Sequence, residues 1–264
     1  MKKIKINPKF GQLTNSLTKL INIKNELIDI LLNSKSNDPN SISFNWLLHF
    51  TSKCFIKQAE TEIGPSFNST LPLATLCYYV LIEIPEFRQI MMAKFIKKCP
   101  FIIGFTCPID TENGRLLMGW KKPNKSSSAF ESLERYNERV GGIFSLYAVL
   151  TRISLLRDPM YSNITYDKLP ITINDGWTMV AKILNIQDES LITDTHFFIL
   201  GNWWDGCATE FLNAFGRQAE KLLKFIAFEF TKNFIKSSPS ALRLMTLGEL
   251  WINENKIEII PPMV

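Results

Sequence analysis

Long hydrophobic runs and metal-ligand clusters are missing from this sequence. No apolar stretch reaches the roughly 18–20 residues that a membrane-spanning helix needs, and the lysine-rich amino terminus lacks the apolar core of a secretory signal. Neither of the 2 histidines has a cysteine or histidine at metal-site spacing. The 5 cysteines contain no CxxC pair, which is typical of reduced, buried thiols. We therefore expect a soluble intracellular protein without a metal centre.

Signatures of the common enzyme families are also absent. The nucleophile-elbow, phosphate-loop, dinucleotide-binding and zinc-protease motifs do not occur. Asp194 lies two residues before His196, a spacing that does not pair side chains on a helix. Cys207 would be a nucleophile only beside a histidine, so a buried thiol is the simpler interpretation. Trp203 and Trp204 fit a core better than a base-stacking surface, because phenylalanines flank them. We expect no catalytic activity.

Apolar and aromatic side chains are plentiful. Of the 264 residues, 46% are hydrophobic, including 19 phenylalanines, which is enough for a large core in one domain or two closely packed ones. Apolar positions recur at helical spacing, and no hairpin signal separates them. The pattern predicts an all-α protein whose helical pairs stack into a solenoid-like bundle. The expected helices cover residues 12–33, 43–63, 71–84, 86–98, 115–120, 131–156, 174–185, 189–203, 205–236 and 239–254.

Several segments are expected to be irregular. Residues 1–10 are basic, contain a proline and predict an extended lead-in. Residues 99–109 are apolar but interrupted by proline and glycine, so we expect a buried connection rather than a strand. Residues 121–128 form the most loop-like segment. The apolar tail 257–264 either docks on the body or frays. Within one long helix, Gly141-Gly142 predicts a kink or a close helix contact.

The distribution of lysine is the feature with chemical content. The net charge of +5 is mild for this length. Lys94, Lys97 and Lys98 are spaced i, i+3, i+4 and fall within about 100° of one face at the end of a helix. Lys53 and Lys57 are one turn apart on another helix. Repulsion of about 0.2–0.5 kcal/mol per pair is offset by about 0.3–1 kcal/mol per cation from the helix dipole. A solvated helix end is therefore a sufficient explanation.

The alternative explanation is a polyanion site. If the two lysine-bearing helices are neighbours, their clusters converge into a pocket for several phosphates, each carrying about −1.5 to −2 charges. The basic lead-in, with Lys3 and Lys5, would form one wall of that pocket or a solvated tail. Both explanations stay open, because the sequence does not show which helices touch.

Stretches along the whole chain resemble one protein family. They are INPKFGQLT (6–14), KQAETE (57–62), KKCPFIIGFT (97–106), ERVGGIFSLYAVLTR (138–152), GWTMVAKILN (176–185), THFFILGNWWD (195–205) and FGRQAEKLL (215–223). In order and wording they are similar to the C-terminal domain of the Gle-type mRNA export factors, and most similar to fungal members. That family's long amino-terminal part, with its coiled coil, is not in this sequence.

The resemblance implies a fold and a ligand site. The fold would be a single all-helical, HEAT-like domain spanning 1–264, similar to the middle domain of a translation-initiation scaffold. The ligand would be inositol hexakisphosphate, held in a basic pocket. By position, the lysines of that pocket are Lys53, Lys94, Lys97 and Lys98, with Lys57, Lys3 and Lys5 alongside. Some relatives carry a different side chain at the position of Lys57.

The resemblance also implies a function and partners. The domain would activate the ATPase cycle and RNA release of a DEAD-box mRNA export helicase in poly(A) mRNA export, at the cytoplasmic face of the nuclear pore complex, between nucleus and cytoplasm. Links to translation initiation, termination and protein transport follow from the family. A phenylalanine-glycine-type nucleoporin would dock on the aromatic-rich helices after about residue 189. No RNA-recognition signature occurs, so no direct nucleic-acid contact is expected. An RNA-binding module and a passive helical scaffold remain the alternatives.

Overall fold

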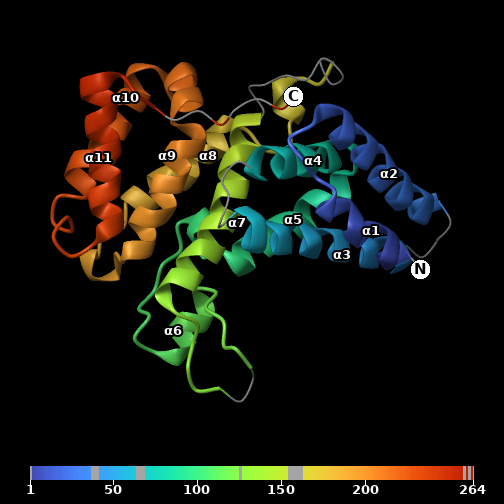
Figure 1. Cartoon of the computed structure of the whole chain (residues 1–264), viewed down its shortest axis with the longest axis horizontal. Helices are drawn as coiled ribbons and strands as arrows, with labels where there is room; N and C mark the ends of the chain where they lie inside the picture. Colours follow the sequence, from blue (N-terminus) through green and yellow to red (C-terminus); the bar gives the residue numbers. More distant parts are fainter. Residues whose placement is uncertain are drawn as a thin grey trace.

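A computed structural model of the chain describes residues 2–36, 42–63, 69–124, 127–153, 163–257, 260 and 263. Within these ranges every regular element is a helix (Figure 1). The α-helices are α1 (Lys2–Gly11), α2 (Leu17–Ser36), α3 (Ile42–Gln58), α4 (Thr70–Glu83), α5 (Pro85–Lys98), α6 (Glu112–Leu117), α7 (Leu133–Ile153), α8 (Ile173–Leu184), α9 (Asp194–Phe215), α10 (Arg217–Lys224) and α11 (Pro239–Glu254). The all-α prediction is confirmed for the described chain, and no helix there is long and apolar enough to span a bilayer.

Shorter helical segments complete the fold. Turns of 3-10 helix occur at Pro100–Ile103, Tyr166–Lys168 and Glu189–Leu191, and π-helical segments follow α3 at Ala59–Ile63 and α10 at Phe225–Phe230. The expected helix at 43–63 is therefore present, although its last turn is π-helical.

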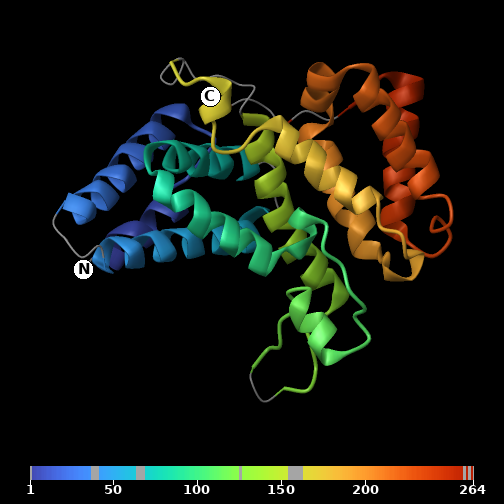
Figure 2. The same cartoon turned by 180° about the vertical axis from the view of Figure 1, so that it is seen from behind.

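Helix α7 lies at the centre of the molecule and contacts both halves (Figures 1 and 2). It packs against α4 and α5 on one side and against α8 and α9 on the other. Its contact with α9 is close at Gly141, where a Cβ would lie 2.5 Å from Cε1 of Phe198. The predicted close helix contact at the glycine pair is thus confirmed. The first turns of α7 and helix α6 project as an arm (Figure 1).

The amino-terminal half is a stack of helices in alternating directions. Helix α4 is apolar on every side, and all residues from Thr70 to Leu81 are buried. Pro85 is the first residue of α5. Helix α5 runs in the same direction as α3 and opposite to α4 (Figure 2). Helices α3 and α5 pack against each other, and the Phe55 and Phe87 rings have centroids 6.0 Å apart. The bounds predicted for α4 and α5 are confirmed within one residue at each end.

The predicted extended lead-in at 1–10 is wrong. Helix α1 occupies this segment with Pro8 inside it, at a cost of about 3 kcal/mol. Ile6 and Phe10, one turn apart, are buried, and the Phe10 ring packs edge-to-face on Phe55 with centroids 4.8 Å apart. Each buried apolar side chain contributes about 1.5–3 kcal/mol. Tertiary packing on α3 therefore outweighs the local preference of proline.

Several helix boundaries in the carboxy-terminal half differ from the prediction. The break expected near Trp204 does not exist, because α9 continues to Phe215. The chain breaks at Gly216, whose φ of 50° is in the left-handed region that glycine tolerates. The predicted helix 205–236 is therefore divided among α9, α10 and the π-helical segment. Helix α11 has the predicted bounds. Helices α2 and α6 begin at Leu17 and Glu112 instead of 12 and 115.

The irregular segments mostly follow the prediction. Phe101 and Ile102 are buried in the connection after α5, whereas Phe105 is exposed. In the tail, Ile260 is buried and Met263 packs against the core, so these two residues dock on the body. Residues 154–162, which include the end of the predicted helix 131–156, lie outside the described residues. Residues 258–259 of the tail do so as well.

Candidate functional site

The two lysine clusters lie on helices that touch. Lys53 and Lys57 are exposed on α3, and Lys97 is exposed in the last turn of α5, with Lys94 and Lys98 half-buried beside it. Contact between α3 and α5 was the condition for a shared anion site, and it is met. Lys3 and Lys5 belong to α1, which packs against α3, but their side chains lie outside the described residues.

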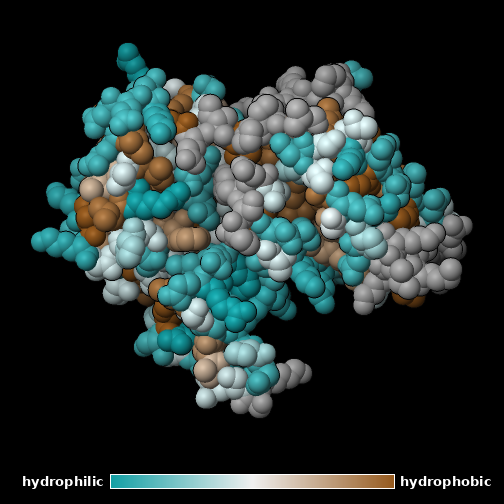
Figure 3. Space-filling view, viewed as in Figure 1, coloured by the Kyte–Doolittle hydropathy of each residue, from teal (hydrophilic) through white to brown (hydrophobic). Residues whose placement is uncertain are grey.

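These lysines are not neutralised within the described part of the chain. Every ion pair found there involves other cations, so no carboxylate lies within 4.0 Å of the five described lysines of the two clusters. The carboxyl end of α5 favours cations through its dipole, but the ammonium groups repel one another. In the view of Figure 3, the surface between the amino-terminal helices and the arm is mainly hydrophilic. Positive charge without carboxylate partners attracts anions.

The surroundings of Lys98 disfavour its positive charge. Burial lowers the pKa of Lys98, and the charges of Lys121, Arg139 and Lys97 lower it further, while Glu60 opposes them. A lowered lysine pKa means that the fold disfavours the ammonium form. An anion bound beside Lys98 would remove that penalty.

A partly buried ionic network borders Lys98. The Glu60 carboxylate accepts a hydrogen bond from Nζ of Lys121 at 2.8 Å and lies 3.4 Å from Nη1 of Arg139. Arg139 also donates to Glu131 through Nη2 at 2.5 Å and Nε at 3.1 Å. Burial alone would lower the pKa of Arg139, but the hydrogen bond and charge of Glu131 and the charge of Glu60 raise it. The network joins the segment after α3 to α7 and fixes the surroundings of Lys98.

Sequence reasoning did not find this network. Glu60, Lys121 and Arg139 are far apart along the chain, and their pairing depends on the fold. The only signal was indirect: Glu60 lies in the stretch KQAETE and Arg139 in ERVGG, both of which carried the resemblance. The network residues line a cavity of about 420 Å³ with Lys122, Arg135 and Glu138. Its mixture of acids and bases makes it a poorer polyanion site than the lysine clusters.

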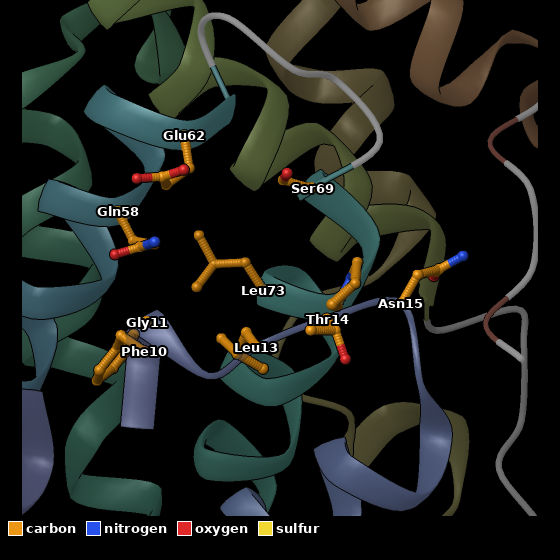
Figure 4. Close-up of a pocket in the computed structure, with 10 residues that line it drawn as sticks. Phe10, Gly11, Leu13, Thr14, Asn15, Gln58, Glu62, Ser69 and Leu73 are labelled. Carbon is orange, nitrogen blue, oxygen red and sulfur yellow. The ribbon is translucent and has the colours of Figure 1, made fainter. Parts of the chain in front are cut away.

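A second cavity, of about 270 Å³, lies between α1, the end of α3 and the start of α4 (Figure 4). Phe10 and Leu13 line it on one side and Gln58, Glu62 and Leu73 on others. Neither lysine nor arginine is among the described residues that line it. A carboxylate without a basic partner in the wall repels phosphate, so this cavity does not fit a polyanion.

The side chains considered for catalysis have structural roles. His196 is buried against Phe101 with ring centroids 4.9 Å apart, and burial lowers its pKa to about 4. Asp194 accepts hydrogen bonds from Ser238 and Ser240 at the start of α11. Burial raises the pKa of Cys207. Among the described residues no group of three or more His, Cys, Asp or Glu side chains is placed to hold a metal.

The predicted core role of the tryptophan pair is confirmed. Trp203 and Trp204 are buried, as are Phe197 and Phe211, and Phe198, Phe215, Phe228, Phe230 and Phe234 pack against the core. Buried aromatics cannot form a docking surface. The exposed large apolar side chains of α10, α11 and the segment between them are Phe225, Leu242 and Ile252.

Comparisons with known proteins agree on one family. The family model described as GLE1-like protein matches residues 1–227. The mRNA export factor GLE1 of Saccharomyces cerevisiae is 45% identical over 99% of this chain and 47% of its own length. That of Schizosaccharomyces pombe is 28% identical over 95% of this chain and 50% of its own length. The chain thus spans about half the length of these curated relatives.

A solved structure is similar over the whole chain. It contains the Saccharomyces cerevisiae Dbp5 C-terminal domain, with one substitution, bound to Gle1 and IP6. The similarity has a TM-score of 0.92 and 44% sequence identity, covering 100% of this chain and 86% of that chain. The backbone arrangement described above is therefore one that occurs in a chain bound together with IP6 and a second protein.

Proposed function

Because the chain belongs to the GLE1-like protein family, we propose that it binds inositol hexakisphosphate (IP6) and activates the ATPase cycle and RNA release of a DEAD-box mRNA export helicase. The observation that carries the proposal is the pair of lysine clusters on contacting helices α3 and α5, without carboxylate partners in the described chain. The solved complex of a similar chain with IP6 and the Dbp5 C-terminal domain supports both the ligand and the partner.

The lysines proposed to hold the phosphates are Lys3, Lys5, Lys53, Lys57, Lys94, Lys97 and Lys98. Six phosphates bring on the order of −9 to −12 charges, which exceeds what these single positive charges supply. The bound ligand would remain anionic on its outer side and attract cations of a second protein. This bridging would weaken with salt, since exposed charges are screened over about 8 Å at physiological ionic strength.

The domain would act as a regulator and perform no chemistry itself. By binding one conformation of the helicase better than another, it shifts the helicase population toward the form that releases RNA and nucleotide. We place this action in poly(A) mRNA export at the cytoplasmic face of the nuclear pore complex. A phenylalanine-glycine-type nucleoporin would dock on the α9–α11 half, where Phe225, Leu242 and Ile252 are exposed.

We also propose that the successive helices form HEAT-like pairs, similar to the middle domain of a translation-initiation scaffold, within one domain spanning 1–264. The support is that α2 contacts α3 and α4 contacts α5, while α4 and α5 run in opposite directions (Figure 2). Superposition of these pairs on one another tests this assignment.

Helicase ATPase activity, measured with this chain while IP6 is titrated, tests the proposed function. We expect stimulation that requires both the chain and IP6, and at least a tenfold weaker response to IP6 in Lys97→Gln/Lys98→Gln. The matched control is Lys221→Gln/Lys224→Gln, which removes two exposed lysines from the last turn of α10. Calorimetry of IP6 binding to each variant shows whether the weaker ATPase response is caused by weaker IP6 binding.

The alternatives predict other results. A passive scaffold leaves the helicase ATPase rate unchanged by the chain with or without IP6. An RNA-binding module binds single-stranded RNA without helicase, at an affinity similar to that for IP6. Equal IP6 affinity in both double variants would show that the α5 lysines are only a solvated helix end.

A further inference from the structure

The exposed face of α3 carries a continuous row of side chains. Ile42 is 72% exposed and Trp46 is 52% exposed. Phe50, one turn further, is half-buried and stacks on Trp46 with centroids 5.4 Å and planes 2° apart. Lys53 and Lys57 continue the row. We call Ile42, Trp46, Phe50, Lys53 and Lys57 the α3 ridge.

The ridge is one straight stripe on the helix surface. Its members are spaced 4, 4, 3 and 4 residues apart, which places them within about 80° of arc at 100° per residue. From Ile42 to Lys57 the ridge is about 22 Å long at 1.5 Å per residue. Its first half is apolar and aromatic, and its second half is basic. A partner that covers the stripe therefore meets both kinds of chemistry.

In the apolar half of the ridge, Ile42 and Trp46 are exposed, whereas Phe50 packs against the core. The opposite side of α3, with Phe44, Leu47, Leu48 and Phe55, is buried against α1, α2, α4 and α5. Single exposed apolar residues are ordinary, but a contiguous row marks an interaction surface. The parallel stack also fixes the Trp46 ring against its neighbour, which lowers the entropy lost when a partner covers it.

The position of the ridge identifies the partner. Lys53 and Lys57 belong to the proposed IP6 site, and Trp46 lies about 10 Å from Lys53 along the helix. A standard interface covers about 800 Å² on each partner, a patch nearly 30 Å across. A folded domain that touches IP6 over Lys53 and Lys57 thus also covers the next two turns of α3, including Trp46.

We propose that the apolar half of the α3 ridge is a docking surface for the C-terminal domain of the helicase, which receives Trp46 and Ile42 in an apolar depression beside its IP6-contacting cations. This inference rests on the proposed function, because it takes the helicase as the protein bridged by IP6. The contact has two parts with different physics. The bridge through IP6 is electrostatic and is weakened by salt, whereas the aromatic anchor buries apolar area and resists salt.

The test is to measure two affinities for each variant of the full chain: IP6 alone, and the helicase C-terminal domain at saturating IP6. We expect Trp46→Ala to weaken helicase-domain binding at least tenfold, both at about 0.1 M and at about 0.5 M salt, with IP6 affinity within twofold of the original. Tyr166→Ala, at another exposed aromatic side chain, in the 3-10 turn Tyr166–Lys168, is the matched control and should change neither affinity.

A second variant separates docking from folding. Ile42 is the first residue of α3 and is mostly exposed. Ile42→Ser should therefore leave the thermal midpoint unchanged and weaken binding of the helicase domain several-fold. Unchanged helicase-domain affinity in both variants would overturn the ridge proposal and leave the IP6 function standing. Loss of self-association in Trp46→Ala, with helicase binding intact, would instead assign the ridge to a second copy. Absence of any helicase-domain binding by the unaltered chain at saturating IP6 would overturn both proposals.

Discussion

Arg139 and Glu131 form a bidentate guanidinium–carboxylate pair whose side chains are only 9% and 11% exposed. The pair ties α7 to the segment that precedes it. The Glu131 carboxylate also accepts a hydrogen bond from the backbone amide of Lys121 at 2.8 Å, and Arg139 donates to the carbonyl of Gly119 at 2.8 Å. Two chain segments and the neighbourhood of Lys98 therefore depend on one buried charge pair.

Removal of one member of this pair should destabilise the fold strongly. In Glu131→Ala the Arg139 guanidinium stays buried with its main partner gone, which costs about 3–5 kcal/mol in comparable cases. Urea unfolding measures the loss. Glu138→Ala, an exposed glutamate next to Arg139 on α7, is the control and should stay within about 0.5 kcal/mol. Equal stability of the two variants would mean that the pair contributes nothing to the fold.

Lys98→Gln should change how stability depends on pH. The folded pKa of Lys98 lies below its ordinary value of 10.5, chiefly because of burial. Between the folded pKa and 10.5 the unfolded chain binds more protons at this site than the folded chain. The free energy of unfolding therefore rises with pH through that window. Below the window, the charged Lys98 lowers the free energy of unfolding by a constant amount. We expect Lys98→Gln to be at least as stable as the original chain near pH 7 without ligand.

The comparison across pH gives the measurement for Lys98. As pH rises toward about 10, the original chain should gain free energy of unfolding relative to Lys98→Gln. Lys224→Gln, at an exposed lysine of α10, serves as the control. A difference between the original chain and Lys98→Gln that stays constant over this range would contradict the electrostatic explanation.

Gly141→Ala should destabilise the contact between α7 and α9. The added Cβ would lie 2.5 Å from Cε1 of Phe198 and 2.7 Å from Nδ2 of Asn202, so one helix must move. Overpacking of this kind costs about 1–3 kcal/mol, and a lower thermal midpoint would report it. At Gly11 a Cβ meets nothing within 4 Å, so Gly11→Ala should keep or slightly raise the midpoint. A Gly141→Ala midpoint equal to that of Gly11→Ala would show that the helices adjust freely.

Some features of this protein follow from the sequence by itself. Hydrophobic spacing of 3–4 residues and the prolines at 72, 85, 100 and 239 predicted the helical class and the bounds of α4, α5 and α11. These signals are local, because a helix needs only its own backbone hydrogen bonds and one apolar face. The presence of two lysine clusters and the resemblance to a family are properties of the sequence in the same way.

Other features were decided by the tertiary structure. Residues 2–11 form a helix because Phe10 packs on Phe55. Helix α9 continues past residue 204 because side chains before and after the expected break, such as Trp203 and Cys207, are buried. The contact between α3 and α5, and the meeting of Glu60 with Arg139 79 residues away, depend on which helices share a core. That choice is made by the packing of the whole chain, since side chains distant in sequence interact only after their helices are in place.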